Sequence, residues 1–231
     1  MSIFTVVLFL LIILLILNNI RQLIQKSKFD KSEYAMETKA NFYKTIEDKG
    51  ALGEYLTTKV LEKLPGKHRM IINAYIPNKK SNTTEIDVLF IHETGIYVLE
   101  SKNYGGWIYG KDSDCCWTQR FPNGHESQFY NPILQNEGHI KALKRMLVDT
   151  PDQRFISVIV FSDRCQLKKV SSDILICRRE HLRVNFLKLI KGKSRVLNEE
   201  EIENLYEKIK RYAAVSEAAK TAHIQNINNS I

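Results

Sequence analysis

Two apolar strands joined by a short turn constrain this chain more than any other stretch of it. In the segment 85–102, runs rich in β-branched and aromatic residues flank His-Glu-Thr-Gly, a pattern typical of a β-hairpin. With Glu93 and Thr94 at the tip, residues whose numbers sum to 187 face each other. The predicted register therefore places Asp87 opposite Glu100.

This register sets two acidic side chains together on one face of a sheet. Directly opposed residues of an antiparallel pair have Cβ atoms about 4.5–5.5 Å apart, and like charges at such positions destabilise the sheet. Lys102 lies two positions beyond Glu100 and is expected on the same face. A divalent cation bound between Asp87 and Glu100 would remove the repulsion. The alternative is an exposed sheet face with a cross-strand ion pair to Lys102, which contributes only about 0–1 kcal/mol.

The N-terminal segment differs in character from the rest of the chain. Residues 3–17 contain a single polar side chain, Thr5, and no charged residue precedes Arg21. A bilayer core requires about 20 residues of apolar helix, so we predict a transmembrane anchor over residues 1–20. A cleaved signal peptide is disfavoured because no basic residue precedes the run and no small-residue cleavage site follows it. A buried core helix is the remaining alternative.

Basic residues follow the anchor directly. By the positive-inside rule, they place the N-terminus outside the cell membrane and the rest of this single-pass chain in the cytoplasm. These residues are Arg21, Lys26 and Lys28.

The charge and cysteine content narrow the class of partner. The net charge of +8 and the pI of about 9.2 suit nucleic acid or an anionic membrane surface. Topology explains the basic residues beside the anchor, but not those farther along the chain. The latter include Lys141, Lys144, Arg145, Lys168, Lys169, Arg178 and Arg179. The four cysteines show no zinc-binding spacing, and reduced thiols are expected in the cytosol.

Periodicity divides the remaining chain into a helical or partly ordered juxtamembrane stalk, a domain and a weakly ordered tail. The limits are 21–48 for the stalk, 49–212 for the domain and 213–231 for the tail. We predict helices over 50–64, 132–147, 181–190 and 198–212, and strands over 70–76, the hairpin, 107–109, 116–120, 154–162 and 173–177. This order indicates one α/β domain with a mixed sheet.

The spacing of Asp87 and Glu100-x-Lys102 resembles the pattern of the PD-(D/E)xK nuclease superfamily, with Ile86 in place of the leading proline. The wider arrangement resembles one family within it, the nuclease-related domain (NERD), over roughly residues 45–165, with a motif core of about 49–165. The motifs are Gly50-x-x-Gly53-Glu54, Glu85-Ile86-Asp87, Gly95-Ile96-Tyr97-Val98-Leu99-Glu100-Ser101-Lys102 and Asn131-Pro132-x-x-Gln135. The resemblance implies a restriction-endonuclease-like mixed β-sheet core flanked by helices, and phosphodiesterase activity.

The acidic pair suits a hard cation such as Mg²⁺ or Mn²⁺, because one or two carboxylates with water and phosphate usually hold such an ion. Asp87 and Glu100 would be its ligands. Lys102 would orient the attacking water or stabilise charge on the phosphate. By resemblance, Glu54 would be a further ligand or a water-mediated contact, and Gln135 would bond a phosphate oxygen or a base edge.

Three more residues are weighed for contact with nucleic acid. Tyr104, beside the loop that leaves Lys102, and Lys141 are candidates. His139 follows Gln135 by one turn on the same helical face. We expect His139 to be partly exposed and without a role, with a phosphate contact as the alternative.

The sequence thus predicts a membrane-anchored, metal-dependent nuclease that acts on DNA, or on RNA. Two other classes stay open at this point. The first is a binding module that tethers nucleic acid at the membrane without cutting it. The second is an interaction module that contacts other membrane proteins. The three residues Asp87, Glu100 and Lys102 favour catalysis.

Overall fold

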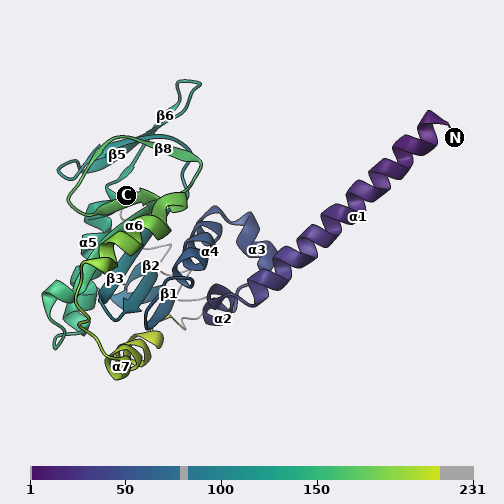
Figure 1. The fold of residues 1–231 in the computed structure, drawn as a ribbon. Helices are drawn as coiled ribbons and strands as arrows, with labels where there is room; N and C mark the ends of the chain where they lie inside the picture. Colours follow the sequence, from purple (N-terminus) through teal and green to yellow (C-terminus); the bar gives the residue numbers. More distant parts are fainter. Residues whose placement is uncertain (1, 79–82, 214–231) are drawn as a thin grey trace.

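The computed structural model describes residues 2–78 and 83–213 and shows a folded α/β part from which one long helix extends (Figure 1). A five-stranded mixed sheet has the order β1-β2-β3-β7-β9. Its strands are β1 (His68–Pro77), β2 (Thr83–His92), β3 (Gly95–Lys102), β7 (Phe155–Phe161) and β9 (Leu175–Arg178). Val88 faces Leu99 and His92 faces Gly95, which confirms the predicted register of the hairpin. Strand β7 runs parallel to β3 and to β9.

A second mixed sheet has the order β6-β5-β4-β8. It packs against β7 and against Ile133, at the start of the helix Pro132–Met146. Its strands are β4 (Gly106–Lys111), β5 (Cys116–Arg120), β6 (Glu126–Tyr130) and β8 (Cys165–Ser171). The sequence prediction missed β6 and β8. Both consist largely of polar residues, and their hydrogen-bonded neighbours, not an apolar pattern of their own, define them as strands.

Helices cover both faces of the five-stranded sheet. They are α4 (Lys49–Leu61), α5 (Pro132–Met146), α6 (Arg179–Lys191) and α7 (Glu199–Lys210), with one 3₁₀ turn, η1 (Asp152–Arg154). Leu89 and Val98 pack with α5 and α7, whereas Val88 and Leu99 pack with α4 and α6. This alternation is the period of two expected of strands buried on both faces. The predicted mixed α/β architecture is confirmed.

Two predicted helix starts have the expected caps. The side chain of Asn131 accepts a hydrogen bond from the backbone of Ile133, and Pro132 occupies the first turn of α5. Asn198 and Glu201 form a reciprocal capping box at the start of α7. The cap at Asn131 sets where α5 begins, and therefore which of its residues contact β3.

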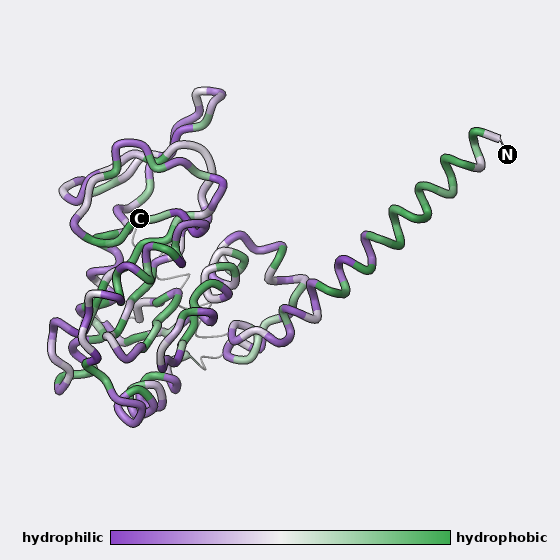
Figure 2. The backbone as a smooth tube through the Cα atoms, viewed as in Figure 1, coloured by the Kyte–Doolittle hydropathy of each residue, from purple (hydrophilic) through white to green (hydrophobic). Residues whose placement is uncertain are grey.

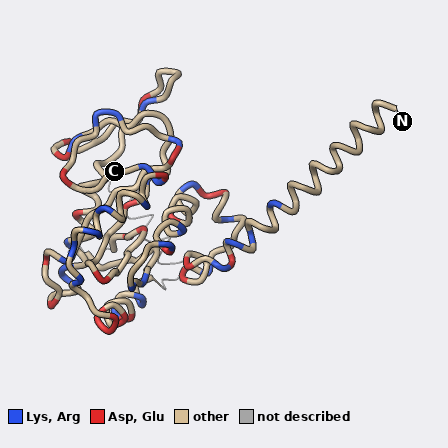
Figure 3. Tube along the Cα trace, viewed as in Figure 1, with Lys and Arg blue, Asp and Glu red and all other residues tan. Residues whose placement is uncertain are grey.

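The N-terminal helix α1 (Ile3–Asp30) is continuous and projects away from the folded part (Figure 1). It is apolar over most of its length (Figure 2), and its basic residues begin near the junction with the folded part (Figure 3). Among the described residues it is the one helix long and apolar enough to cross a membrane.

The end of α1 enters the hydrophobic core of the folded part. Phe29 is fully buried in an aromatic cluster that joins α1 to two short helices, to α4 and to β1. The short helices are α2 (Glu33–Thr38) and α3 (Phe42–Glu47), and the partners are Tyr34, Phe42, Tyr55 and Ile72. Residues 29–47 therefore pack against the domain. The predicted domain limits stay predictions, and the predicted tail, apart from Ala213, lies outside the described residues.

Candidate active site

The end of β3 and the first turns of α5 bring three predicted site residues into contact. Glu100 is 1% exposed, and its Oε1 lies 2.7 Å from Nζ of Lys102. The same ammonium donates a hydrogen bond of 3.0 Å to Oε1 of Gln135. Glu100 and Lys102 share a face because they are two positions apart on the strand. Gln135 lies one turn after the cap of α5, which aims it at that face.

His139 also belongs to this cluster, which contradicts the expectation of a partly exposed histidine. It is 4% exposed, its Nε2 lies 3.1 Å from Oε2 of Glu100, and its Nδ1 lies 2.7 Å from Oγ1 of Thr84. Asn136, His139 and Leu143 recur at three- and four-residue intervals, so His139 falls on the buried stripe of α5. That periodicity, together with the one-turn spacing from Gln135, was the signal available in the sequence.

Asp87 lies at an irregularity in β1 and β2. The regular pairs of β2 with β3 end at Val88, one pair short of Asp87 and Glu100. Ile86 and Leu89 pack in the same cluster, so the alternation of faces reverses between them. The backbone N–H of Ser101 donates a hydrogen bond of 2.7 Å to Oδ2 of Asp87, which orients this carboxylate.

Asn73 of β1 faces Asp87 across this irregularity, between the regular pairs on either side. Its φ of 55° is in the left-handed region, and its side-chain Oδ1 is buried without a hydrogen-bond partner among the described residues. Both features are rare in non-glycine residues of a strand. The sequence reasoning did not identify Asn73, because no local pattern marks it.

Glu54 approaches the site from α4. Tyr34 donates a hydrogen bond of 3.3 Å to its Oε2. Burial raises the pKa of Glu54 to about 7, against the opposing effect of a hydrogen bond from Asn73. A Cβ on the neighbouring Gly53 would lie 3.1 Å from the Cβ of Asn103, so glycine permits the close approach of α4 to the end of β3.

The pKa values of Asp87 and Glu100 shift in opposite directions. Burial, followed by the nearby charges of Glu100 and Glu54, raises the pKa of Asp87 well above its ordinary value. Burial would also raise the pKa of Glu100, but the Lys102 ammonium and the His139 hydrogen bond outweigh it and leave that pKa lowered. The pKa of Lys102 is raised, because Glu100 more than offsets the effect of burial. The raised pKa of Lys102 favours its charged form, whereas the raised pKa of Asp87 means that the charged form of this carboxylate is disfavoured until a cation lies beside it.

The donor atoms fit a hard divalent cation. In residues 2–78 and 83–213, no three acidic, histidine or cysteine side chains form a ready-made metal cage. Mg²⁺ needs only one or two carboxylates, since water and phosphate complete its coordination. The mutual repulsion of Asp87, Glu100 and Glu54 favours a cation among them.

Of the other two candidates, Tyr104 lies near enough to Lys102 to contribute to its raised pKa, whereas Lys141 lies apart. The ring of Tyr104 packs against Phe129 with a centroid distance of 4.7 Å. Lys141 has 69% of its side chain exposed and pairs with Glu137 at 3.5 Å on the outer side of α5. The structure does not bring Lys141 to the cluster around Glu100.

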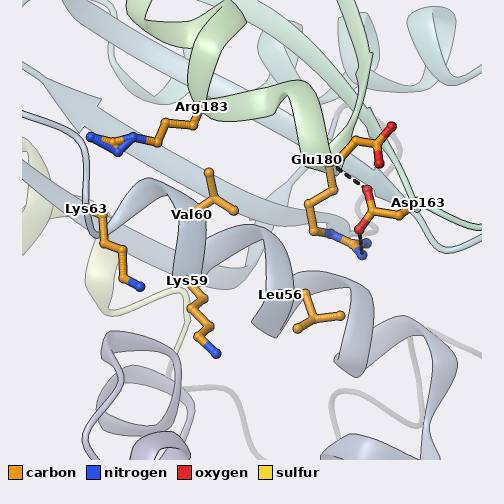
Figure 4. Close-up of a pocket in the computed structure, with 8 residues that line it drawn as sticks. Leu56, Lys59, Val60, Lys63, Asp163, Glu180 and Arg183 are labelled. Atoms are coloured by element: carbon orange, nitrogen blue, oxygen red, sulfur yellow. Dashed lines mark hydrogen bonds and ion pairs between the residues drawn. The ribbon is translucent and has the colours of Figure 1, made fainter.

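A hollow of 320 Å³ lies between α4 and α6 (Figure 4). Asp163 accepts a hydrogen bond from the backbone of Glu180 at the start of α6 and lies 3.9 Å from the buried Arg179. Arg179 donates to Oγ1 of Thr57 at 3.3 Å, and Thr57 lies 3.3 Å from Oγ of Ser101. This polar chain fixes the strand position whose N–H orients the Asp87 carboxylate.

A mixed sheet that carries an aspartate, a Glu-x-Lys pair and a helix-borne glutamine at one site defines a nuclease fold of the PD-(D/E)xK superfamily. Within that class, the chain belongs to the nuclease-related domain (NERD) family, which matches residues 49–162. It is 34% identical over 187 residues to an uncharacterised protein of Bacillus anthracis, a match that covers 78% of this chain and 84% of that relative. No solved structure matches the chain.

Proposed function

We propose that this protein is a membrane-anchored, metal-dependent nuclease that hydrolyses phosphodiester bonds of DNA, or of RNA, on the cytoplasmic side. One observation carries the proposal. In a NERD domain, the buried Glu100 is held between Lys102 and His139 beside a second carboxylate, Asp87, whose pKa is raised by burial and by like charges. A fold has no structural need for such a cluster, because burying an unpaired or repelling charge is costly.

Asp87 and Glu100, with Glu54 as a further ligand, would hold Mg²⁺ or Mn²⁺. A bound cation supplies Lewis acidity and positive charge for phosphoryl chemistry. The family supports this requirement, since nucleases of this superfamily typically use Mg²⁺.

Lys102 donates hydrogen bonds and does not act as a base, because its pKa is raised. It would orient the attacking water and stabilise the negative charge that develops on the phosphate. Gln135 accepts a hydrogen bond from Lys102 through its amide oxygen, and its amide nitrogen can donate to a phosphate oxygen or a base edge. In the reaction, the oxygen of water bonds to phosphorus and the water releases a proton to solvent, the bond to the leaving sugar oxygen breaks, and that oxygen takes up a proton.

The proposed location follows from α1. Its apolar length suits a membrane span, and the basic residues that come after residue 20 favour a cytoplasmic domain. Nucleic acid is the partner that the family and the net charge of +8 support. DNA, RNA or both would be substrates.

The full chain in lipid nanodiscs tests this proposal with plasmid DNA, single-stranded DNA and RNA. We expect cleavage with Mg²⁺ or Mn²⁺ that EDTA abolishes and that Glu100→Gln and Lys102→Ala each remove. Lys141→Ala is the matched control, because it removes a lysine outside the catalytic cluster. Metal-dependent cleavage that survives both active-site substitutions would refute the assignment of the site. Salt-dependent binding without turnover in any divalent metal would instead favour a tethering module.

A further inference from the structure

A cavity of 620 Å³ lies between the short helices that follow α1 and the domain itself. Its walls come from α2, α3, α4 and β1. This volume is within the range of roughly 300–1,000 Å³ that small-ligand pockets occupy. Tyr206 of α7 donates a hydrogen bond of 2.7 Å to Glu37, which holds α2 against the domain. The buried Phe29 packs with residues of α2, α3 and α4 and so holds these helices together. The cavity is therefore part of the folded structure.

The inner part of the cavity approaches the candidate active site through one of its carboxylates, Glu54. Glu54 and Asn73 both line it. The charge of Glu54 helps to raise the pKa of Asp87. Asn73 on β1 lies opposite Asp87 on the adjacent strand β2. The buried Oδ1 of Asn73 has no partner among the described residues, and its backbone is in a left-handed conformation. Strain and an unpaired polar atom at one residue are features of functional surfaces.

The outer rim of the cavity is basic. Lys39 and Lys44 line it and are exposed, and neither has a described carboxylate within 4.0 Å. The left-handed backbone of Lys39, at the end of α2, sets its position. The acidic Asp48 in the same wall is already engaged, since its Oδ1 accepts a hydrogen bond of 2.7 Å from the backbone of Ala51. Two unpaired ammonium groups at the mouth of a cavity suit phosphate.

We propose that this cavity holds the sugar-phosphate backbone of a single substrate strand next to the cleaved bond, with Lys39 and Lys44 contacting its phosphates. The inference rests on the proposed nuclease function and assigns a place to its substrate. Both lysines precede residues 49–162, the segment that matches the family. The segment that connects the anchor to the domain thus forms one wall of the substrate site, and a cavity of this size holds one strand and not a duplex.

The test is equilibrium binding of a fluorescent single-stranded oligonucleotide to the full chain in nanodiscs of zwitterionic lipid, with EDTA present. The double variant Lys39→Glu/Lys44→Glu is expected to bind at least about tenfold more weakly. The slope of log K against log salt should fall in magnitude by about 1.4, since each phosphate contact to a single strand contributes about 0.7. Lys39→Gln/Lys44→Gln should give an intermediate loss of binding.

The matched control is Lys191→Glu/Lys208→Glu, which makes the same charge change at exposed positions of α6 and α7. It should bind within about twofold of the unaltered protein, and tryptophan fluorescence should show that every variant is folded. Equal binding by both double variants would overturn the inference. A cleavage assay separates the two proposals. Weakened binding in a protein that never cuts leaves the cavity assignment standing, whereas cutting with unchanged binding by Lys39→Glu/Lys44→Glu refutes the cavity alone.

Discussion

His139 lies 3.1 Å from Glu100 through Nε2 and uses its other ring nitrogen to contact Thr84. The imidazole therefore joins α5 to β2 and β3 at the carboxylate that is expected to hold the cation. Both ring nitrogens have partners in a buried setting, so the orientation of the ring is fixed. Through that ring, the orientation of Glu100 is fixed as well.

Replacing His139 tests this positioning role. We expect His139→Ala to lower Mn²⁺ affinity or cleavage rate about 10- to 100-fold, as substitutions behind metal ligands do. His139→Gln retains a donor near the Nε2 position and should recover part of the loss. The measurements are Mn²⁺ titration and single-turnover cleavage, with the exposed His181→Ala as the control. Unchanged Mn²⁺ affinity and rate in His139→Ala would contradict the role.

Asp87→Asn tests the repulsion between carboxylates. Without divalent metal, the variant should be at least as stable as the unaltered protein, because the amide removes a buried acid beside Glu100. With cation at 100 times its dissociation constant, the unaltered protein should gain about 2.7 kcal/mol and the variant should gain little. Thermal unfolding with and without Mg²⁺ or Mn²⁺ measures both quantities. A variant that cation stabilises as much as the parent would exclude Asp87 as a ligand.

Phe29→Ala tests how firmly α1 is joined to the domain. Phe29 is fully buried, and truncating such a side chain costs about 3–5 kcal/mol. The comparison is Phe9→Ala, which removes the same ring from an exposed position of α1. Urea unfolding followed by tryptophan fluorescence should detect the loss for Phe29→Ala and none for Phe9→Ala. Equal stability of the two would show that α1 does not pack on the domain.

The cysteines give a prediction that depends on pH. Burial raises the pKa of Cys165 and of Cys177 to about 11, whereas Cys115 and Cys116 are exposed. A thiol reagent at pH 8 should therefore label two thiols in the native protein and four after unfolding. Because these pKa values are raised on folding, the stability gained from the protonated thiols is present below about pH 9 and lost as pH rises through 11. Rapid labelling of all four native thiols would contradict the burial.

Local patterns predicted much of this molecule. The turn His-Glu-Thr-Gly and its apolar flanks set the register that places Glu100 and Lys102 on one face, and Asn131-Pro132 set the start of α5. Each of these features is determined within a few residues of the chain, where periodicity and capping chemistry act.

The parts that escaped prediction depend on contacts between distant segments. The reversal of strand alternation at Asn73 and Asp87 has no local signature, and it turns Asp87 toward the N–H of Ser101. Phe29 falls within the predicted stalk, and no local pattern shows that it packs in a cluster with distant residues of the domain. Strand β8 is mostly polar and exists through its pairing with β4. Tertiary structure decides such features, and a window of neighbouring residues does not contain them.

The continuity of α1 determines how far the candidate active site can travel. If residues 1–20 cross the bilayer as proposed, the ten residues from there to Asp30 form a rigid spacer of about 15 Å. A flexible tether would let the domain search a wide volume, whereas a helix locked in place by Phe29 keeps it close to the lipid surface. Such an enzyme would act on strands that pass near the inner face of the membrane, and would leave the nucleic acid of the cell interior out of its reach.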